Sequence, residues 1–431
     1  EVVAVAKGDD GEVGAVAMLA DLPEGNGLGR VGIGGEPGVV AGLGQVAHGV
    51  EGDGFEEDDE ALFVARETHP RKAIAHSADA HYTHGRMSHL LNVPSVSIPT
   101  DSRGRMDLDA LEWFLKGGGI GTVVMTAGTT GLGAVDPIDK AIPLCRKYGV
   151  RVHVDAAYGG FFRLLADDDS LLAPEVAAAF RAIDEADSVV IDPHKHGLQP
   201  YGCGAVIFKD PNVANFYDHT SPYTYFTTGD DIHMGEISLE CSRSGASAAA
   251  LWMTLQLLPL TREGMGEVVA PGRRAALAWA EKLRASDVFE LYQEPDLDIV
   301  SYFPIGDSLT DIDRRSGAIL TAGMNAPRDE SLFVATYQVD ADDMAARGHV
   351  IDERSAGSAQ EGEPLVGARI LRSVTMKPET EPVIDQIHAA AEALARQAAT
   401  AERDAPLPDE EVAEPGRQSG TAQGAEHAQG Q

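Results

Sequence analysis

The feature that most constrains this chain is residues 189–208, VVIDPHKHGLQPYGCGAVIF. The opening run of β-branched residues is typical of a buried parallel strand, and Asp192 and Pro193 end it. Lys195 therefore lies just past the carboxyl end of a strand, where open α/β sheets bind their ligands. The glycines and prolines that follow predict a tight turn before AVIF re-enters the sheet.

A second strand with a polar end lies forty residues upstream. Residues 151–154 predict the strand, Asp155 ends it, and Ala156 and Ala157 leave room for a flat ligand. A carboxylate inside a sheet is costly unless it meets a cation or hydrogen-bond donors. Pyridoxal phosphate needs a lysine amine for a Schiff base and a carboxylate facing its pyridinium nitrogen. Asp155 and Lys195 together therefore predict a pyridoxal phosphate site.

Strand and helix patterns alternate upstream of Asp155. Helices of this length between strands predict right-handed parallel crossovers and a doubly wound α/β sheet. Thr129 and Thr130 also follow a strand, so we expect them at the same rim as Asp155 and Lys195. The expected strands are residues 73–75, 95–98 and 121–126, and the expected helices are residues 58–66, 108–115 and 137–148.

A chain of 431 residues exceeds what one core usually supports. We expect a large cofactor-binding domain over residues 55–260. A linking helix and a smaller α+β domain follow over residues 261–400, and residues 401–431 predict a disordered acidic tail. The expected strands of the smaller domain are residues 289–292, 299–303, 332–339 and 369–376; the expected helices are residues 246–257, 275–285 and 382–397.

The charge balance is unusual, with 68 acidic residues against 34 basic ones and a net charge of −34. This excess argues against a nucleic-acid partner, which requires clustered cations, and favours a solvated, halophile-like surface suited to a high-salt cytoplasm. Cys145, Cys203 and Cys241 are widely spaced, which predicts a reducing compartment and no structural zinc. The sequence has no membrane-spanning apolar run and no signal-peptide pattern, so we expect a cytoplasmic protein without a membrane partner.

Four histidines cluster in HSADAHYTHGRMSHLL, at His76, His81, His84 and His89. Their spacing is not that of a zinc site, and no metal is predicted. His76, His84 and His89 are expected to be ordinary loop or helix-face residues.

Residues 1–54 are rich in glycine and show neither helical nor strand periodicity, which predicts a poorly ordered segment. The fragments GNGLG and GIGGEPG are weak candidates for phosphate-binding turns, since no strand and helix pattern flanks them.

The motifs HVDAAYGG and DPHK, with GTT and HY upstream, resemble those of the group II pyridoxal-phosphate-dependent amino-acid decarboxylases. This family includes aromatic-amino-acid, glutamate and archaeal tyrosine/aspartate decarboxylases, and the resemblance covers about residues 61–397. It implies an aspartate-aminotransferase-like fold (fold type I) and a homodimer with the active site at the subunit interface. The implied reaction releases the α-carboxyl group of an amino acid as carbon dioxide.

The resemblance also implies roles for four residues that would surround the cofactor's ring. Lys195 would hold the cofactor as a Schiff base, and Asp155 would pair with its ring nitrogen. Ala157 would pack against one ring face, while His81 would stack on the other and assist proton transfer.

Further roles follow from the same resemblance. Thr130 would contact the cofactor, and Asp192 and His194 would lie towards its phosphate. Tyr225, with Tyr223 as the alternative, would protonate the α-carbon from a mobile lid.

One departure from the family concerns the phosphate-binding turn, which is normally rich in glycine and hydroxyl groups and opens a helix. The corresponding stretch here has Gly34 and Gly35 but no hydroxyl, and Glu36 would repel an anion. The family's longer N-terminal region is also largely missing. We hypothesise that a reading-frame error, restored near Phe55, explains both departures.

Two alternatives to decarboxylation stay open. An aldehyde lyase or desulfurase would use the same cofactor, although Cys203 and Cys241 are expected to be buried rather than reactive. An inactive product would lack cofactor because its phosphate turn is lost. The sequence does not identify the amino-acid substrate.

Overall fold

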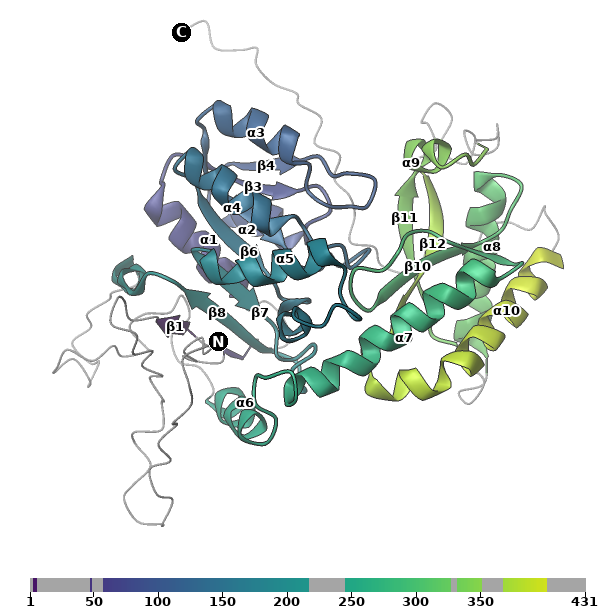
Figure 1. Ribbon diagram of the computed structural model, residues 1–431. Helices are drawn as coiled ribbons and strands as arrows, with labels where there is room; N and C mark the ends of the chain where they lie inside the picture. Colours follow the sequence, from purple (N-terminus) through teal and green to yellow (C-terminus); the bar gives the residue numbers. More distant parts are fainter. Residues whose placement is uncertain are drawn as a thin grey trace, which may run out of the picture.

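The computed structural model describes residues 3–5, 47–48, 57–216, 245–326, 332–350 and 367–400, which form two sheets with flanking helices (Figure 1). The larger sheet has the order β1-β8-β7-β6-β5-β3-β4, and β2 pairs with β8. Its strands are β1 (Val3–Val5), β2 (Ala47–His48), β3 (Ala73–Ser77), β4 (Ser95–Ile98), β5 (Ile120–Thr126), β6 (Arg151–Asp155), β7 (Ser188–Ile191) and β8 (Cys203–Phe208).

The strands from β4 to β7 are parallel, as predicted, whereas β8 runs antiparallel to β7. Every residue of the central strand β5 is buried. Its sequence IGTVVMT lacks hydrophobic alternation because helices cover both faces of a parallel sheet.

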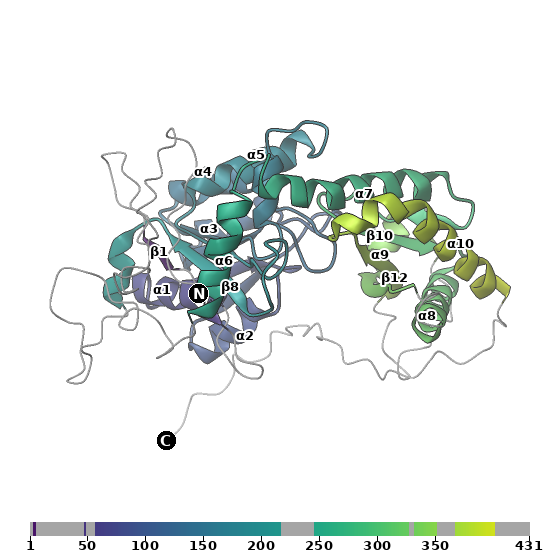
Figure 2. The same ribbon diagram turned by 90° about the horizontal axis from the view of Figure 1, so that it is seen from below.

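Helices pack on the two faces of the large sheet (Figure 2). Leu111, Ile142 and Val176, from α3, α4 and α5, belong to the core cluster on one face. Leu62 of α1 and Met87 of α2 pack together on the other face. The helices are α1 (Glu57–Thr68), α2 (Thr83–Leu90), α3 (Leu108–Lys116), α4 (Ile138–Lys147), α5 (Pro174–Ala182) and α6 (Ala246–Leu257).

The smaller sheet is antiparallel, with the order β11-β12-β10-β9, and the long helix α7 (Met265–Ala285) runs from the larger sheet to it (Figure 1). All four strands were predicted, but the helices α8 and α9 were not. No helix within the described ranges is both long and apolar enough to cross a bilayer. The remaining elements are β9 (Phe289–Leu291), β10 (Ile299–Pro304), β11 (Ala335–Asp340), β12 (Gly367–Val374), α8 (Leu309–Asn325), α9 (Ala341–Ala346) and α10 (Ile384–Thr400).

Several sequence predictions fall outside the described residues. They concern the glycine-rich turn at Gly34, Gly35 and Glu36, the lid that carries Tyr223 and Tyr225, and the acidic tail. These predictions, and the domain boundaries at residues 55, 260 and 400, stay predictions.

Asp136, in the loop after β5, accepts hydrogen bonds from the backbone of two other segments. Its Oδ1 accepts the N–H of Met106 and its Oδ2 accepts the N–H of Thr126, both at 2.7 Å. Complete burial raises the pKa of Asp136 to about 7, although the two N–H donors oppose this shift.

The Asp136 carboxyl therefore makes stability depend on pH. Because the folded pKa lies above the unfolded value, its stabilising contribution is full below about pH 4 and is lost as the pH rises through about 7. We expect the unfolding free energy of wild type minus that of Asp136→Asn to fall over this range, by on the order of 4 kcal/mol. Urea unfolding from pH 4 to 8 measures this difference, and a flat difference would contradict the prediction.

Candidate active site

The carboxyl end of the parallel sheet brings Asp155 and Lys195 to one edge. Asp155 is the last residue of β6, and in the ladder it pairs with Thr126 on β5 and Val190 on β7. Lys195 follows the end of β7 by four residues. Since β6 and β7 are adjacent and parallel, both residues lie at the edge that the sequence predicted.

The Asp155 carboxylate is buried and held by two donors. Its Oδ2 accepts Nε2–H of His84 at 3.0 Å, and its Oδ1 accepts the N–H of Ala157 at 3.1 Å. Burial raises the pKa of Asp155, but the His84 hydrogen bond and the charges of His84 and Lys195 outweigh it and hold this pKa below its ordinary value. Asp155 is therefore ionised in the folded protein.

The Lys195 amine forms its ion pair with Asp192 rather than with Asp155. Lys195 Nζ lies 2.7 Å from Asp192 Oδ2, and His194 Nε2 lies 3.6 Å from the same oxygen. His194 also donates Nδ1–H to the Cys203 carbonyl at 2.9 Å. The Lys195 side chain is 34% exposed, so it is accessible to a small molecule. Asp192 thus orients the amine, while Lys195 acts on Asp155 through its charge.

The turn after Lys195 is tightly packed, as its glycines predicted. A Cβ on Gly197 would lie 2.6 Å from the Phe161 ring and 2.8 Å from Pro193, so only glycine fits there. Gly202 has a φ of +87°, which favours glycine. Gln199 donates Nε2–H to Thr254 Oγ1 of α6 at 2.8 Å, which anchors the turn to this helix.

Two other predicted residues, His81 and Thr130, follow the carboxyl ends of the neighbouring strands β3 and β5. His81 precedes α2, and its ring centroid lies 4.3 Å from that of Tyr82. Thr130 is exposed after β5, whereas the buried Thr129 accepts the N–H of Ala134 at 3.0 Å. Within the described ranges, no hydrogen bond or ion pair joins His81 or Thr130 to Asp155 or Lys195, so their roles stay predictions.

His84 contradicts its sequence interpretation. It was expected to be an ordinary loop or helix-face residue, yet its side chain is fully buried and bonded to Asp155. Its sequence signal is weak, because nothing local distinguishes it from His89, which is exposed on the same helix.

Asp298, which directly precedes β10 of the smaller sheet, joins two segments of the site. Its Oδ1 accepts the hydroxyl of Tyr158 at 2.6 Å, and its Oδ2 accepts Nε2–H of His196 at 2.8 Å. Burial, followed by the charge of Asp298, raises the pKa of Tyr158 well above its ordinary value. Tyr158 lies three residues after Asp155 and His196 directly follows Lys195, so both key segments depend on this buried carboxylate.

Arg372 is a cation that the sequence interpretation missed. It lies on β12 and donates Nε–H to the carbonyl of Gly131 at 2.9 Å, next to Thr130. Burial lowers the pKa of Arg372, and the negative charge of Asp298 opposes this shift. The sequence signal that could have identified Arg372 is its position as a charged residue in a strand with apolar neighbours. Its Nη groups form no hydrogen bond within the described residues.

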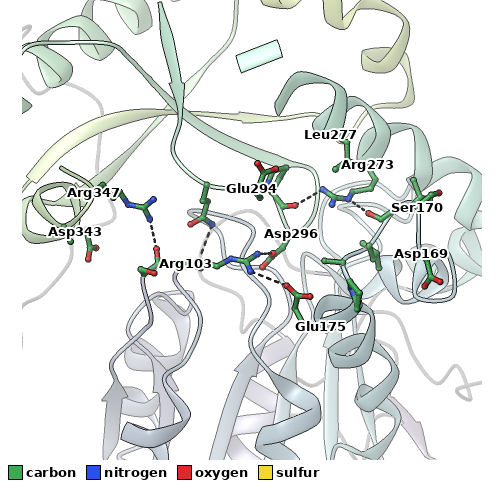
Figure 3. A pocket seen from close by; sticks show the side chains of 18 residues that line it. Arg103, Asp169, Ser170, Glu175, Arg273, Leu277, Glu294, Asp296, Asp343 and Arg347 are labelled. Carbon is green, nitrogen blue, oxygen red and sulfur yellow. Dashed lines mark hydrogen bonds and ion pairs between the residues drawn. The ribbon is translucent and has the colours of Figure 1, made fainter. Parts of the chain in front are cut away.

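A cavity of about 770 Å³ lies between the two parts of the fold (Figure 3). Neither Lys195 nor Asp155 lines it. Arg103 in its wall pairs with Asp296 and, at 3.4 Å, with Glu175. Arg347 donates to the carbonyl of Ser102 at 2.7 Å. These cations bind groups of the protein itself, so the site that we describe is the sheet edge.

The chain is similar in sequence to a known protein family and to curated proteins. Residues 59–304, more than half of the chain, match the pyridoxal-dependent decarboxylase conserved domain. The chain is 34% identical to an L-tyrosine decarboxylase of Enterococcus faecium over 48% of this chain and 41% of the relative. It is 32% identical to an aspartate 1-decarboxylase of Aliivibrio fischeri, over 53% of this chain and 41% of the relative.

Solved structures show the same fold. The crystal structure of Oryza sativa TDC with PLP and tryptamine has a TM-score of 0.63 and 17% identity, and the match covers 79% of this chain and 68% of that chain. The fold is thus the predicted aspartate-aminotransferase-like α/β fold with a smaller α+β domain. The chain spans about two-fifths of the length of the curated relatives cited above. With its motifs on this fold and with the match over residues 59–304, the chain belongs to the pyridoxal-dependent decarboxylase family.

Proposed function

We propose that this chain catalyses the pyridoxal-phosphate-dependent decarboxylation of an L-amino acid to the corresponding amine and carbon dioxide. The observation that carries the proposal is the ionised, buried carboxylate of Asp155 at the same sheet edge as the accessible amine of Lys195. The family match and the relatives named for tyrosine and aspartate decarboxylation support it.

The residues at this edge fit the cofactor chemically. A carboxylate that stays ionised while buried can bind a protonated ring nitrogen, and an amine is required for covalent attachment. The small side chain of Ala157, directly after this carboxylate, leaves room for a ring. Lys195 would therefore hold the cofactor, and Asp155 would bind its ring nitrogen.

When bound, pyridoxal phosphate supplies an electron sink for the negative charge left on the α-carbon as carbon dioxide departs. Asp155 provides a fixed negative charge in a buried setting, which needs no reorganisation during the reaction. Asp192 binds the Lys195 ammonium group and orients it. Tyr225 is proposed to deliver a proton to the α-carbon, and Arg372 to bind an anionic group of the substrate.

The two cysteines that the structure describes do not favour sulfur transfer as the reaction. Cys145 and Cys203 are buried, which confirms the expectation for Cys203, whereas Cys241 lies outside the described residues. Burial raises the pKa of Cys145 to about 12, so its thiolate is scarce at neutral pH.

The test is a panel of L-amino acids incubated with purified protein and pyridoxal phosphate. Carbon dioxide and amine should form in equal amounts from at least one of them. Release of an aldehyde or of sulfide in place of carbon dioxide would refute the proposal. The panel includes tyrosine, aspartate and 2,4-diaminobutyrate, which the names of the relatives suggest.

We further propose that the active form is a homodimer that covers an apolar patch beside the site. The patch comprises Leu198, Tyr201, Trp252, Met253 and Leu257, all of them exposed. Tyr201 is 82% exposed and Leu257 is 79% exposed. Helix α6 is apolar on all sides, and such a helix is normally buried. The hydrogen bond from Gln199 to Thr254 connects the patch to the Lys195 turn.

Leu257→Glu is expected to convert the dimer to a monomer, because it places a charge in an apolar interface. Sedimentation velocity at about 10 µM, a concentration at which interfaces of standard size persist, measures the change. Leu90→Glu is the matched control, since Leu90 is 62% exposed on α2, outside the patch. A monomeric wild type, or equal dissociation by both variants, would refute the proposed dimer.

A further inference from the structure

The His84–Asp155 hydrogen bond brings together two side chains that lie 71 residues apart. His84 is in the first turn of α2 and is fully buried, and Asp155 is 5% exposed. The ring nitrogen Nε2 must carry the proton in this contact, because an ionised carboxylate only accepts.

The contact also fixes the orientation of the carboxylate. His84 donates to Oδ2, while the backbone N–H of Ala157 donates to Oδ1. Two donors on different oxygens restrict rotation of the carboxylate about its side-chain bond. A hydrogen bond to a buried charged group contributes about 1.5–3 kcal/mol, which corresponds to roughly 10- to 100-fold in an equilibrium constant.

Among the described residues, Lys195 and His76 are ionisable groups that act on this pair. Lys195 acts on Asp155 through its charge, and Asp192 binds Lys195. The ring centroid of His76, on β3, lies 6.1 Å from that of His84. Burial lowers the pKa of His76, and the charge of His84 adds to this shift, although the Ser77 carbonyl opposes it. His76 is thus neutral near pH 7, and Asp155 is the anion that His84 meets.

We infer that His84 is a positioning residue of the cofactor site, which holds the Asp155 carboxylate ionised and in one orientation for the ring nitrogen of pyridoxal phosphate. This inference rests on the proposed function. His84 itself acts through Asp155 and takes no part in bond breaking.

Three variants test this role. His84→Leu removes the donor at similar size, and His84→Gln retains an N–H donor. His89→Leu is the control, because His89 is exposed on the same helix. Circular dichroism and thermal unfolding verify that each variant is folded.

The first readout uses the apoprotein and needs no activity. In ¹⁵N-histidine spectra, a solvent-protected Nε2–H resonance should be present in wild type, absent in His84→Leu and shifted in Asp155→Asn. Absence of this resonance from wild type would overturn the inference.

The second readout is the dissociation constant of pyridoxal phosphate, from an absorbance titration. His84→Leu should bind about 10- to 100-fold more weakly, whereas His84→Gln should remain within about threefold of wild type and His89→Leu should be unchanged. If wild type binds and His84→Leu binds equally well, or if glutamine fails to rescue, the role of His84 is overturned and the proposed function stands. If wild type binds no pyridoxal phosphate, the proposed function falls and the role of His84 falls with it.

Discussion

Replacing Lys195 by alanine is expected to abolish the visible absorption band of bound pyridoxal phosphate and to lower amine formation on the order of 10³-fold or more. Both effects are expected because the cofactor is attached covalently, and the Lys195 side chain ends in an amine that can form this bond at the Asp155 edge. Lys195 is accessible and is oriented by Asp192 at 2.7 Å. Absorbance between 330 and 430 nm and amine release over about an hour measure the two effects.

Lys209→Ala is the matched control for this experiment. Lys209 directly follows β8, is exposed, and donates to the carbonyl of Glu185 at 3.4 Å, away from Asp155. This variant should retain both the band and the activity. A visible band that survives in Lys195→Ala would show that another residue attaches the cofactor.

Replacing Asp298 by alanine is expected to lower the unfolding free energy by about 3–5 kcal/mol, which is a large part of the 5–15 kcal/mol typical of a folded protein. The side chain is 1% exposed and binds Tyr158 and His196. Its removal leaves a buried hydroxyl and a buried imidazole without their acceptor. Urea unfolding, monitored by tryptophan fluorescence, measures the loss.

Asp298→Asn should cost clearly less than the alanine variant. The amide oxygen can still accept the Tyr158 hydroxyl. Nδ1 of His196 has no hydrogen-bond partner among the described residues, so the ring can move its proton there and accept from the new amide group. Asp287→Ala removes an exposed aspartate paired with Arg396 and should change stability little. Equal losses for Asp298→Ala and Asp298→Asn would contradict the explanation.

Much of the fold was predictable because its signals are local. β-branched runs that end in Asp155 or at Asp192 predicted β6 and β7, and helices between the strands predicted the parallel order. Helix α8 was missed because polar residues such as Asp311 and Arg314 interrupt its apolar pattern. In the structure these two residues are buried and form an ion pair at 2.7 Å. The antiparallel direction of β8 depends on the turn after Lys195, and the turn residues alone did not specify it.

The sequence by itself determined which residues end the strands, and so it placed Lys195 and Asp155 at the edge where this fold binds ligands. Only the tertiary structure decided what surrounds them. His84 reaches Asp155 across 71 residues, and His196 and Tyr158 reach Asp298 across 102 and 140. Such hydrogen bonds depend on where whole helices and strands pack. A local sequence pattern does not specify which residues so far apart in the chain will meet. The reactive residues of the site are therefore specified by the residues that end its strands. The hydrogen bonds that control their charge depend on how the helices and strands pack.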